Sequence, residues 1–244
     1  GIGLELAKIA ARDNCDLLLV ADRDLAHVAS ALRDASLGTG SIDILECDLA
    51  TESGIDAVLE KCADRQVDVL MANAGQGEGG EFLDQDWMAI KRTIDTNITG
   101  TVSLIHKIGG TMRAADAGRI LVTGSIVDDI PGPFNLVYNS TKAFVDDFCA
   151  GLSNELKDSD VVVSCLLPGL TDTRFFERAD MVDTFVGQSD AKADPAKVAK
   201  DGYDALLKGE TQKVSGLLNK VQHAFASVLP DDILAQMHRL AAKP

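Results

Sequence analysis

Long apolar runs are missing from this sequence, and its first residues show no signal-peptide pattern. A helix that crosses a bilayer needs about 20 consecutive apolar residues, and a secretory signal places a basic segment before a shorter apolar one. Their absence argues against a membrane-spanning class and predicts a cytoplasmic protein. Repeats, low-complexity tracts and linkers are missing too, so we expect residues 1–244 to form a single domain with a helical tail at about 217–244.

Clustered cysteines and histidines are also lacking. No Cys-x-x-Cys pair occurs, and four of the five cysteines stand beside apolar runs, which indicates small buried residues in a reducing compartment. The four histidines show no metal-ligand spacing. We therefore predict neither a disulfide framework nor a metal site. The residues concerned are Cys15, Cys47, Cys62, Cys149, Cys165, His27, His106, His223 and His238.

Basic residues are few. The chain has 23 lysines and arginines against 38 acidic residues, which gives a net charge of −15 and a pI near 4.5. This balance argues against nucleic acid or an anionic membrane surface as a partner. It leaves room for an anionic cofactor, because backbone N–H groups at a helix N-terminus can hold phosphates. With 46% hydrophobic residues, the length suits one large α/β domain.

Apolar runs typical of strands buried on both faces alternate with segments of helical spacing. The predicted strands lie within 15–24, 41–49, 67–80, 119–125, 161–169 and 212–216. The predicted helices lie within 4–12, 24–35, 53–65, 82–112, 138–157 and 194–210, before a tail that is broken by Pro230. This alternation predicts a Rossmann-type, doubly wound parallel sheet in a three-layer α/β/α arrangement.

A hydroxyl, a phenol and an ammonium follow the predicted strand at 119–125. They belong to Ser125, Tyr138 and Lys142. Residues four apart share one face of a helix, so Lys142 can stand beside Tyr138. A nearby cation lowers the pKa of a phenol from its ordinary value of about 10, which favours proton transfer at neutral pH. Alone, this spacing is weak, because the same pair occurs on many solvated helix faces.

The stretch resembles the active site of the short-chain dehydrogenase/reductase family, in which a serine at a strand end precedes a Tyr-x-x-x-Lys helix. The resemblance implies that Tyr138 is the general acid or base and that Ser125 orients the substrate oxygen. Lys142 would lower the pKa of Tyr138 and bind the nicotinamide ribose. Asn97 stands in a Thr-Asn-x-x-Gly run similar to the family's, where an asparagine bends the helix and supports a water relay.

The family's phosphate-binding turn is matched by Gly1, Ile2 and Gly3. Glycines in this turn let the backbone approach a pyrophosphate at the start of a helix. Family members have a strand and the first part of the turn before this point, so we expect both to precede Gly1 and to be absent from this sequence. The family's Asn-Ala-Gly signature after the fourth strand is matched by Asn73, Ala74 and Gly75.

Two further matches concern the adenosine half of the cofactor. Asp22 ends the second strand of the family pattern, where an acidic residue binds ribose hydroxyls and repels a 2′-phosphate. It favours NAD, whereas the neighbouring Arg23 keeps NADP possible, and a solvated Asp-Arg pair is the alternative. Asp48 and Leu49 are similar to the residues that flank the adenine in the family.

The family's Pro-Gly-x-x-x-Thr turn is matched by Pro168, Gly169, Thr171 and Thr173. The backbone near Thr171 and the hydroxyl of Thr173 would hold the nicotinamide carboxamide. Residues 174–190 fall where the family has a mobile lid over its substrate. The apolar residues of this segment would close a pocket or form helix core; they are Phe175, Phe176, Met181 and Phe185. The tail would pack on a partner subunit or cover the pocket mouth.

Together these matches predict an oxidoreductase that transfers a hydride between a nicotinamide cofactor and a small-molecule carbonyl or secondary alcohol. One alternative is an NADPH-dependent carbonyl or 3-oxoacyl reductase. Another class is a non-catalytic dinucleotide-binding sensor or scaffold. Family members are usually dimers or tetramers, so we expect a homodimer or homotetramer. Asp128 and Asp129 depart from the small residues common in the family; they disfavour anionic substrates if they reach the pocket rim, or are simply solvated.

Overall fold

The computed structural model describes residues 1–35, 40–226 and 228–243. The strands predicted from the apolar runs are present, and every pair of neighbouring strands is parallel. They are β1 (Leu17–Ala21), β2 (Ile42–Glu46), β3 (Val69–Ala72), β4 (Gly118–Thr123), β5 (Val161–Leu167) and β6 (Gln212–Val214). Residues 36–39, 227 and 244 of the predicted domain lie outside the described residues.

The helices follow the predicted order. They are α1 (Ile2–Arg12), α2 (Ala26–Ala35), α3 (Glu52–Cys62), α4 (Trp87–Ile94), α5 (Thr101–Ala114), α6 (Leu136–Glu155), α7 (Phe175–Arg178), α8 (Phe185–Gln188), α9 (Pro195–Lys208), α10 (Leu217–Ala226) and α11 (Asp231–Ala242). Local chemistry sets several boundaries. Asp194 caps α9 through the Ala196 N–H, and the helix ends at Gly209 with a φ of 73°, which glycine adopts without strain.

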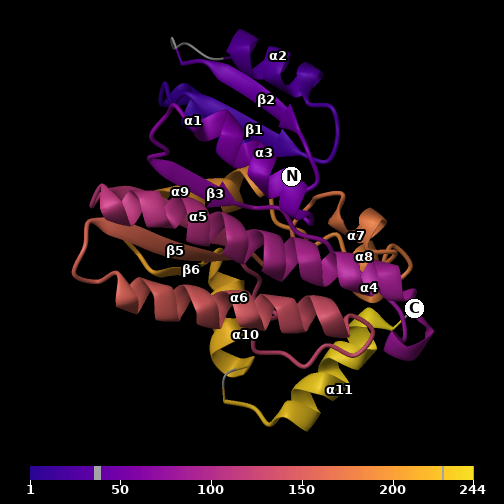
Figure 1. Cartoon of the computed structure of the whole chain (residues 1–244). Coiled ribbons are helices and arrows are strands. Elements are labelled where there is room, and N and C mark those ends of the chain that lie inside the picture. The colour runs from indigo at the N-terminus through magenta and orange to yellow at the C-terminus, as the bar shows by residue number, and fades with distance from the viewer. Residues whose placement is uncertain (36–39, 227, 244) are drawn as a thin grey trace.

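Helices cover both faces of the parallel strands (Figure 1). One face packs against α1, α2 and α9, and the other packs against α3, α5 and α6. Alternation along β4 explains this arrangement, because Ile120 and Val122 face one cluster while Leu121 faces the other, all at most 1% exposed. The doubly wound three-layer architecture is therefore confirmed.

The sheet differs from the prediction in one respect. It is divided into a pair, β1–β2, and a group of four in the order β3–β4–β5–β6. β1 and β3 are not hydrogen-bonded to each other; Leu17–Val20 and Val69–Met71 instead line a common cavity. The expectation of a further strand before Gly1 stays a prediction.

The segment 82–112, which was predicted as one helix, forms four consecutive helical elements. A 3₁₀ turn, η1 (Phe82–Asp84), precedes α4, and a π-helical turn, η2 (Asp95–Gly100), joins α4 to α5. The π turn contains Asn97, whose side chain is held by residues outside the helix. Gly100 is required at its end, because a Cβ there would lie 2.1 Å from the Leu49 carbonyl oxygen.

The predicted tail is helical on both sides of Pro230. α11 packs against α8, and residues of both tail helices line the same cavity as the strand ends. Among the described residues, no helix has the length and apolar character that a membrane crossing requires.

Candidate active site

The carboxyl ends of the strands meet at one edge of the sheet, and the predicted site residues lie there. Several follow a strand by one or two residues, as Asp48 follows β2 and Ser125 follows β4. Others lie on helices, as Tyr138 and Lys142 do on α6. A cavity of about 1650 Å³ includes this edge and continues between β1 and β3. It is lined by Gly1, Ile2, Gly3, Asp22, Arg23, Asp48, Leu49, Asn73, Ala74, Gly75, Ser125, Tyr138, Lys142, Pro168, Gly169, Thr171 and Thr173. Of the predicted site residues, Asn97 alone is not part of its lining.

Tyr138 and Lys142 lie one turn apart on the buried side of α6. The Lys142 Nζ is 5.6 Å from the centroid of the Tyr138 ring and donates a 2.7 Å hydrogen bond to the carbonyl oxygen of Thr123. Ser125, 7% exposed, lies at the end of β4 close enough to the phenol to lower the pKa of Tyr138. The three groups that the sequence placed together are thus assembled by one helix and one strand end.

Burial dominates the electrostatics of this pair. It raises the pKa of Tyr138 to about 12, with Ser125 acting in the opposite direction and Asp128 adding to the rise. Burial also lowers the pKa of Lys142 to about 8. The rise at Tyr138 is opposite to the direction expected from the sequence. In this arrangement the Lys142 ammonium is directed at the Thr123 carbonyl, and it does not offset the desolvation of the phenol.

Asn97 supports the site from behind the cavity. Its Nδ2 donates to the Gln76 carbonyl oxygen at 2.8 Å and to the Thr141 hydroxyl at 2.9 Å, while its Oδ1 accepts from the Gln76 N–H at 2.8 Å. Thr141 in turn donates to the Tyr138 carbonyl oxygen. The side chain, 1% exposed, therefore ties the loop after β3 to the helix that carries Tyr138. Its expected role in a water relay stays a prediction.

The glycines at the start of α1 lie opposite two other predicted site residues. A Cβ on Gly3 would lie 2.6 Å from the Nδ2 of Asn73, and a Cβ on Gly1 would lie 3.4 Å from a methyl carbon of Thr173. A larger residue at position 3 would therefore displace Asn73. This close packing fits a glycine turn whose backbone must approach both the neighbouring residues and a bound ligand.

Charged residues surround the far end of the cavity. Asp22 accepts two hydrogen bonds from Arg23, at 2.8 and 2.9 Å, and its other carboxylate oxygen is 3.7 Å from Arg92. Arg92 also donates a 2.8 Å hydrogen bond to Asp48. Partial burial raises the pKa of Asp48, but the Ala50 N–H and Arg92 outweigh it and hold this pKa below its usual value.

Three arginines of this region were missed by the sequence analysis: Arg92, Arg174 and Arg178. All three line the cavity. Burial lowers the pKa of Arg178, and the positive charges of Arg23 and Arg174 lower it further, so these side chains lie near one another. No sequence signal marks Arg92, which meets Asp48 from 44 positions away. Arg174 follows the Pro-Gly-x-x-x-Thr turn directly, and that position was the available clue.

The apolar lid residues divide between the two readings of the sequence. Phe175 packs against Tyr138 with 4.8 Å between the ring centroids and an angle of 49° between the ring planes. Phe176 and Met181 are 8% and 2% exposed and belong to a small core cluster with Phe134. Phe185 fits neither reading, because it is 74% exposed. Phe134 itself has a φ of 65°, unusual for a bulky residue, immediately before the helix of Tyr138.

Buried Ser125 and Lys142 and half-buried Tyr138 thus meet beside the carboxyl edge of a Rossmann-type sheet, as the resemblance to nicotinamide-dependent oxidoreductases implied. Residues 1–181 match the family model described as short chain dehydrogenase. The chain therefore belongs to the short-chain dehydrogenase/reductase family.

Individual relatives agree with this membership. The chain is 33% identical over 185 residues to human (Homo sapiens) 17-beta-hydroxysteroid dehydrogenase type 1, covering 73% of this chain and 56% of the relative. It spans about half the length of the curated relatives it first matches. Among solved structures it resembles a short-chain dehydrogenase from Sphingobium yanoikuyae in complex with NADPH (TM-score 0.81, 27% identity, 94% and 92% covered). It also shares the fold of a Burkholderia phymatum enzyme of the family in complex with NAD (TM-score 0.83, 18% identity, 100% and 93% covered).

Proposed function

We propose that this chain catalyses reversible hydride transfer between a nicotinamide cofactor and a carbonyl or secondary alcohol. The observation that carries the proposal is the meeting of Tyr138, Lys142 and Ser125 on the wall of the cavity that the predicted cofactor residues also line. The glycine positions fit such a cofactor, because Gly3 already lies against Asn73 and leaves no side chain in the turn. When bound, the cofactor supplies or accepts the hydride.

The protein residues then manage the proton and the geometry. Tyr138 gives a proton to the substrate oxygen during reduction, and a phenol whose pKa is raised to about 12 by burial keeps that proton until it is needed. Ser125 hydrogen-bonds the same oxygen. In oxidation the phenolate must form, and the Lys142 ammonium one turn away is the cation that would stabilise it against the burial that raises the pKa of Tyr138. The hydrogen bonds of Asn97 fix the position of α6, which carries Tyr138, relative to the loop after β3.

Tyr138→Phe tests this proposal, with Tyr203→Phe as a matched control because the chain has two tyrosines. Turnover of a panel of ketones and secondary alcohols should fall by about 10²–10⁴-fold in Tyr138→Phe. Nucleotide binding, followed by NADH fluorescence, should stay within about twofold, and Tyr203→Phe should keep its activity. Substantial turnover by Tyr138→Phe would sink the assignment. Nucleotide binding without turnover by the wild type would favour a sensor or scaffold.

We infer that NAD is the preferred cofactor and that NADP is the alternative. Asp22 repels a 2′-phosphate, although Arg23 already occupies one of its oxygens. The neighbouring Arg174 and Arg178 favour anionic groups in general. Titrations with NADH and NADPH decide the matter: Asp22→Asn should tighten NADPH binding relative to NADH, and Arg23→Ala should do the reverse.

We infer that the substrate is bulky, apolar and uncharged. The cavity must hold a dinucleotide, and the lid and tail add apolar walls around the remaining space. These walls include Leu170, Phe175, Met181, Val186, Phe225 and Met237. The similarity to a hydroxysteroid dehydrogenase supports the same inference. Parallel assays with polycyclic ketones and with 3-oxoacyl thioesters distinguish it from the reductase alternative, which predicts faster turnover of the thioesters.

We also infer one cytoplasmic domain, with its tail, that assembles as a homodimer or homotetramer. Support comes from an apolar surface at α4 and the start of α6, where Trp87 and Met88 are 62% and 63% exposed beside Leu136 and Phe144. An apolar hollow of about 520 Å³ lies between the same helices. Light scattering of the wild type and of Trp87→Glu tests it; a wild-type monomer would refute it.

A further inference from the structure

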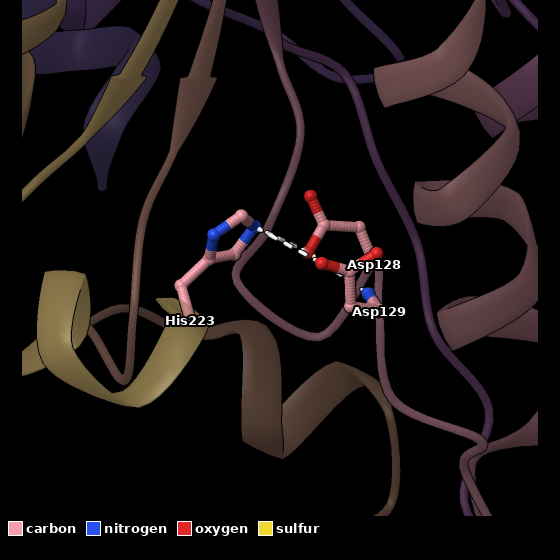
Figure 2. Close-up of side chains that lie close together, drawn as sticks. All are labelled: Asp128, Asp129 and His223. Atoms are coloured by element: carbon pink, nitrogen blue, oxygen red, sulfur yellow. Dashed lines mark hydrogen bonds and ion pairs between the residues drawn. The ribbon is translucent and has the colours of Figure 1, made fainter. Parts of the chain in front are cut away.

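The turn after Ser125 brings two carboxylates against the tail helix α10. Figure 2 shows the ring of His223 turned with its Nε2 toward Asp128 and Asp129. The Nε2 lies 3.2 Å from Oδ1 of Asp128 and 3.8 Å from Oδ2 of Asp129. One possible ligand atom from each of the three residues lies within 4.8 Å of the other two.

Neither Asp128 nor the half-buried His223 has its hydrogen bonds completed. The Asp128 side chain is only 2% exposed, and its Oδ2 has no hydrogen-bond partner among the described residues. The Nε2 of His223 is also buried without a hydrogen bond, although a carboxylate oxygen is near enough in distance. A buried carboxylate and a buried imidazole nitrogen that face each other without an aligned hydrogen bond are costly unless something else binds them.

The cluster carries an excess of negative charge. The carboxylates of Asp128 and Asp129 face a single imidazole, at 3.2 and 3.8 Å from its Nε2. A divalent cation would balance their charge.

The distances fit such an ion. Zinc binds histidine nitrogen and carboxylate oxygen at about 2.0–2.2 Å, so two ligands of a tetrahedral ion lie about 3.3–3.6 Å apart. The two nitrogen–oxygen separations, 3.2 and 3.8 Å, lie on either side of that range, and the two carboxylate oxygens lie within 4.8 Å of each other. A mixed nitrogen and oxygen set favours a first-row transition cation over Mg²⁺ or Ca²⁺, which prefer oxygen ligands.

We propose that Asp128, Asp129 and His223 form a binding site for a divalent transition cation such as Zn²⁺, which links α10 to the turn after Ser125. The proposal goes beyond hydride transfer and does not depend on it. Because residues of α10 line the cavity, the ion would hold that wall beside Ser125. The fourth ligand would be water or a group of a bound molecule.

Competition between the full-length protein and a chromophoric chelator for Zn²⁺ tests the site. The wild type should bind one Zn²⁺ per chain, and His223→Ala and Asp129→Asn should each weaken binding at least about tenfold, since even outer-shell changes cost that much. Asp129 is 46% exposed, so its substitution should leave the fold intact. His106→Ala, at an exposed histidine of α5, is the control and should bind as the wild type does.

A thermal shift provides the second measurement. Added Zn²⁺ should raise the melting temperature of the wild type and of His106→Ala, because a ligand that binds only the folded state stabilises it, and should raise that of Asp129→Asn much less. Absence of stoichiometric Zn²⁺ binding by the wild type would overturn the proposal. Equal binding by the wild type, His223→Ala and Asp129→Asn would overturn it as well.

Discussion

Replacing Lys142 by methionine removes a charge that the fold keeps almost completely out of water. Lys142 is 4% exposed, and burial lowers its pKa from 10.5 to about 8. At about 1.4 kcal/mol for each pKa unit, the charged lysine destabilises the folded protein by roughly 3 kcal/mol at neutral pH. Methionine has a similar length and carries no charge, so Lys142→Met relieves this penalty.

The sign of the pH dependence follows from the two pKa values. Between about pH 8 and pH 10.5 the unfolded lysine holds its proton while the folded one loses it, so the stability of the wild type rises with pH in this window. Lys142→Met lacks this contribution. The difference in stability between the two proteins should therefore move by about 2 kcal/mol in favour of the wild type from about pH 7 to about pH 9.5.

One loss offsets the gain. The 2.7 Å hydrogen bond from the Lys142 ammonium to the Thr123 carbonyl disappears, which costs about 1–3 kcal/mol if the carbonyl stays unpaired. At neutral pH we therefore expect Lys142→Met to be about as stable as the wild type or slightly more stable, yet inactive. This combination separates a buried functional charge from a residue that serves stability.

Urea denaturation of both proteins across this pH range, without nucleotide, measures the effect, and Lys157→Met at an exposed position serves as the control. The control should differ from the wild type by a constant amount. If the difference in unfolding free energy between Lys142→Met and the wild type is also independent of pH, burial does not lower the pKa of Lys142 and the reasoning fails. Turnover by Lys142→Met near the wild-type rate would refute its part in the proposed chemistry.

Three other substitutions have defined outcomes. Gly77→Ala places a Cβ 2.7 Å from the Phe175 ring and 3.4 Å from Tyr138, so kcat/KM should fall by about ten- to a hundredfold while NADH affinity is unchanged; unaltered kinetics would contradict this geometry. Asn97→Ala removes hydrogen bonds to Gln76 and Thr141 and should cost about 2–3 kcal/mol in urea denaturation together with kcat; a loss of kcat alone would point to a relay role instead. Tyr203→Phe breaks the 2.8 Å hydrogen bond to Asp13 and should cost about 1 kcal/mol with full activity, which thermal melting and the standard assay check.

The element order could be predicted because it depends on neighbouring residues. Parallel strands buried on both faces leave continuous apolar runs, as in β5, where six of seven residues are buried. The start of α9 is marked by two adjacent residues, Asp194 as the N-cap and Pro195 as the first helical residue. Much of the candidate site was predictable for the same reason, since Asp22, Asp48, Asn73, Ser125 and Pro168 stand at strand ends and Lys142 stands one helical turn from Tyr138. Parallel strands bring their ends to one edge.

The sequence by itself therefore determined the layered α/β architecture, the family and the residues that gather at the sheet edge. Only the tertiary structure decided how those groups behave, because desolvation and long-range pairing depend on what folds against them. It buried Tyr138 so that its pKa rises, paired Arg92 with Asp48, and separated β1 from β3. It also buried Asp128, which the sequence had left at a pocket rim or in solvent, against a histidine from the distant tail. No local pattern records such contacts, since their partners are adjacent only in space.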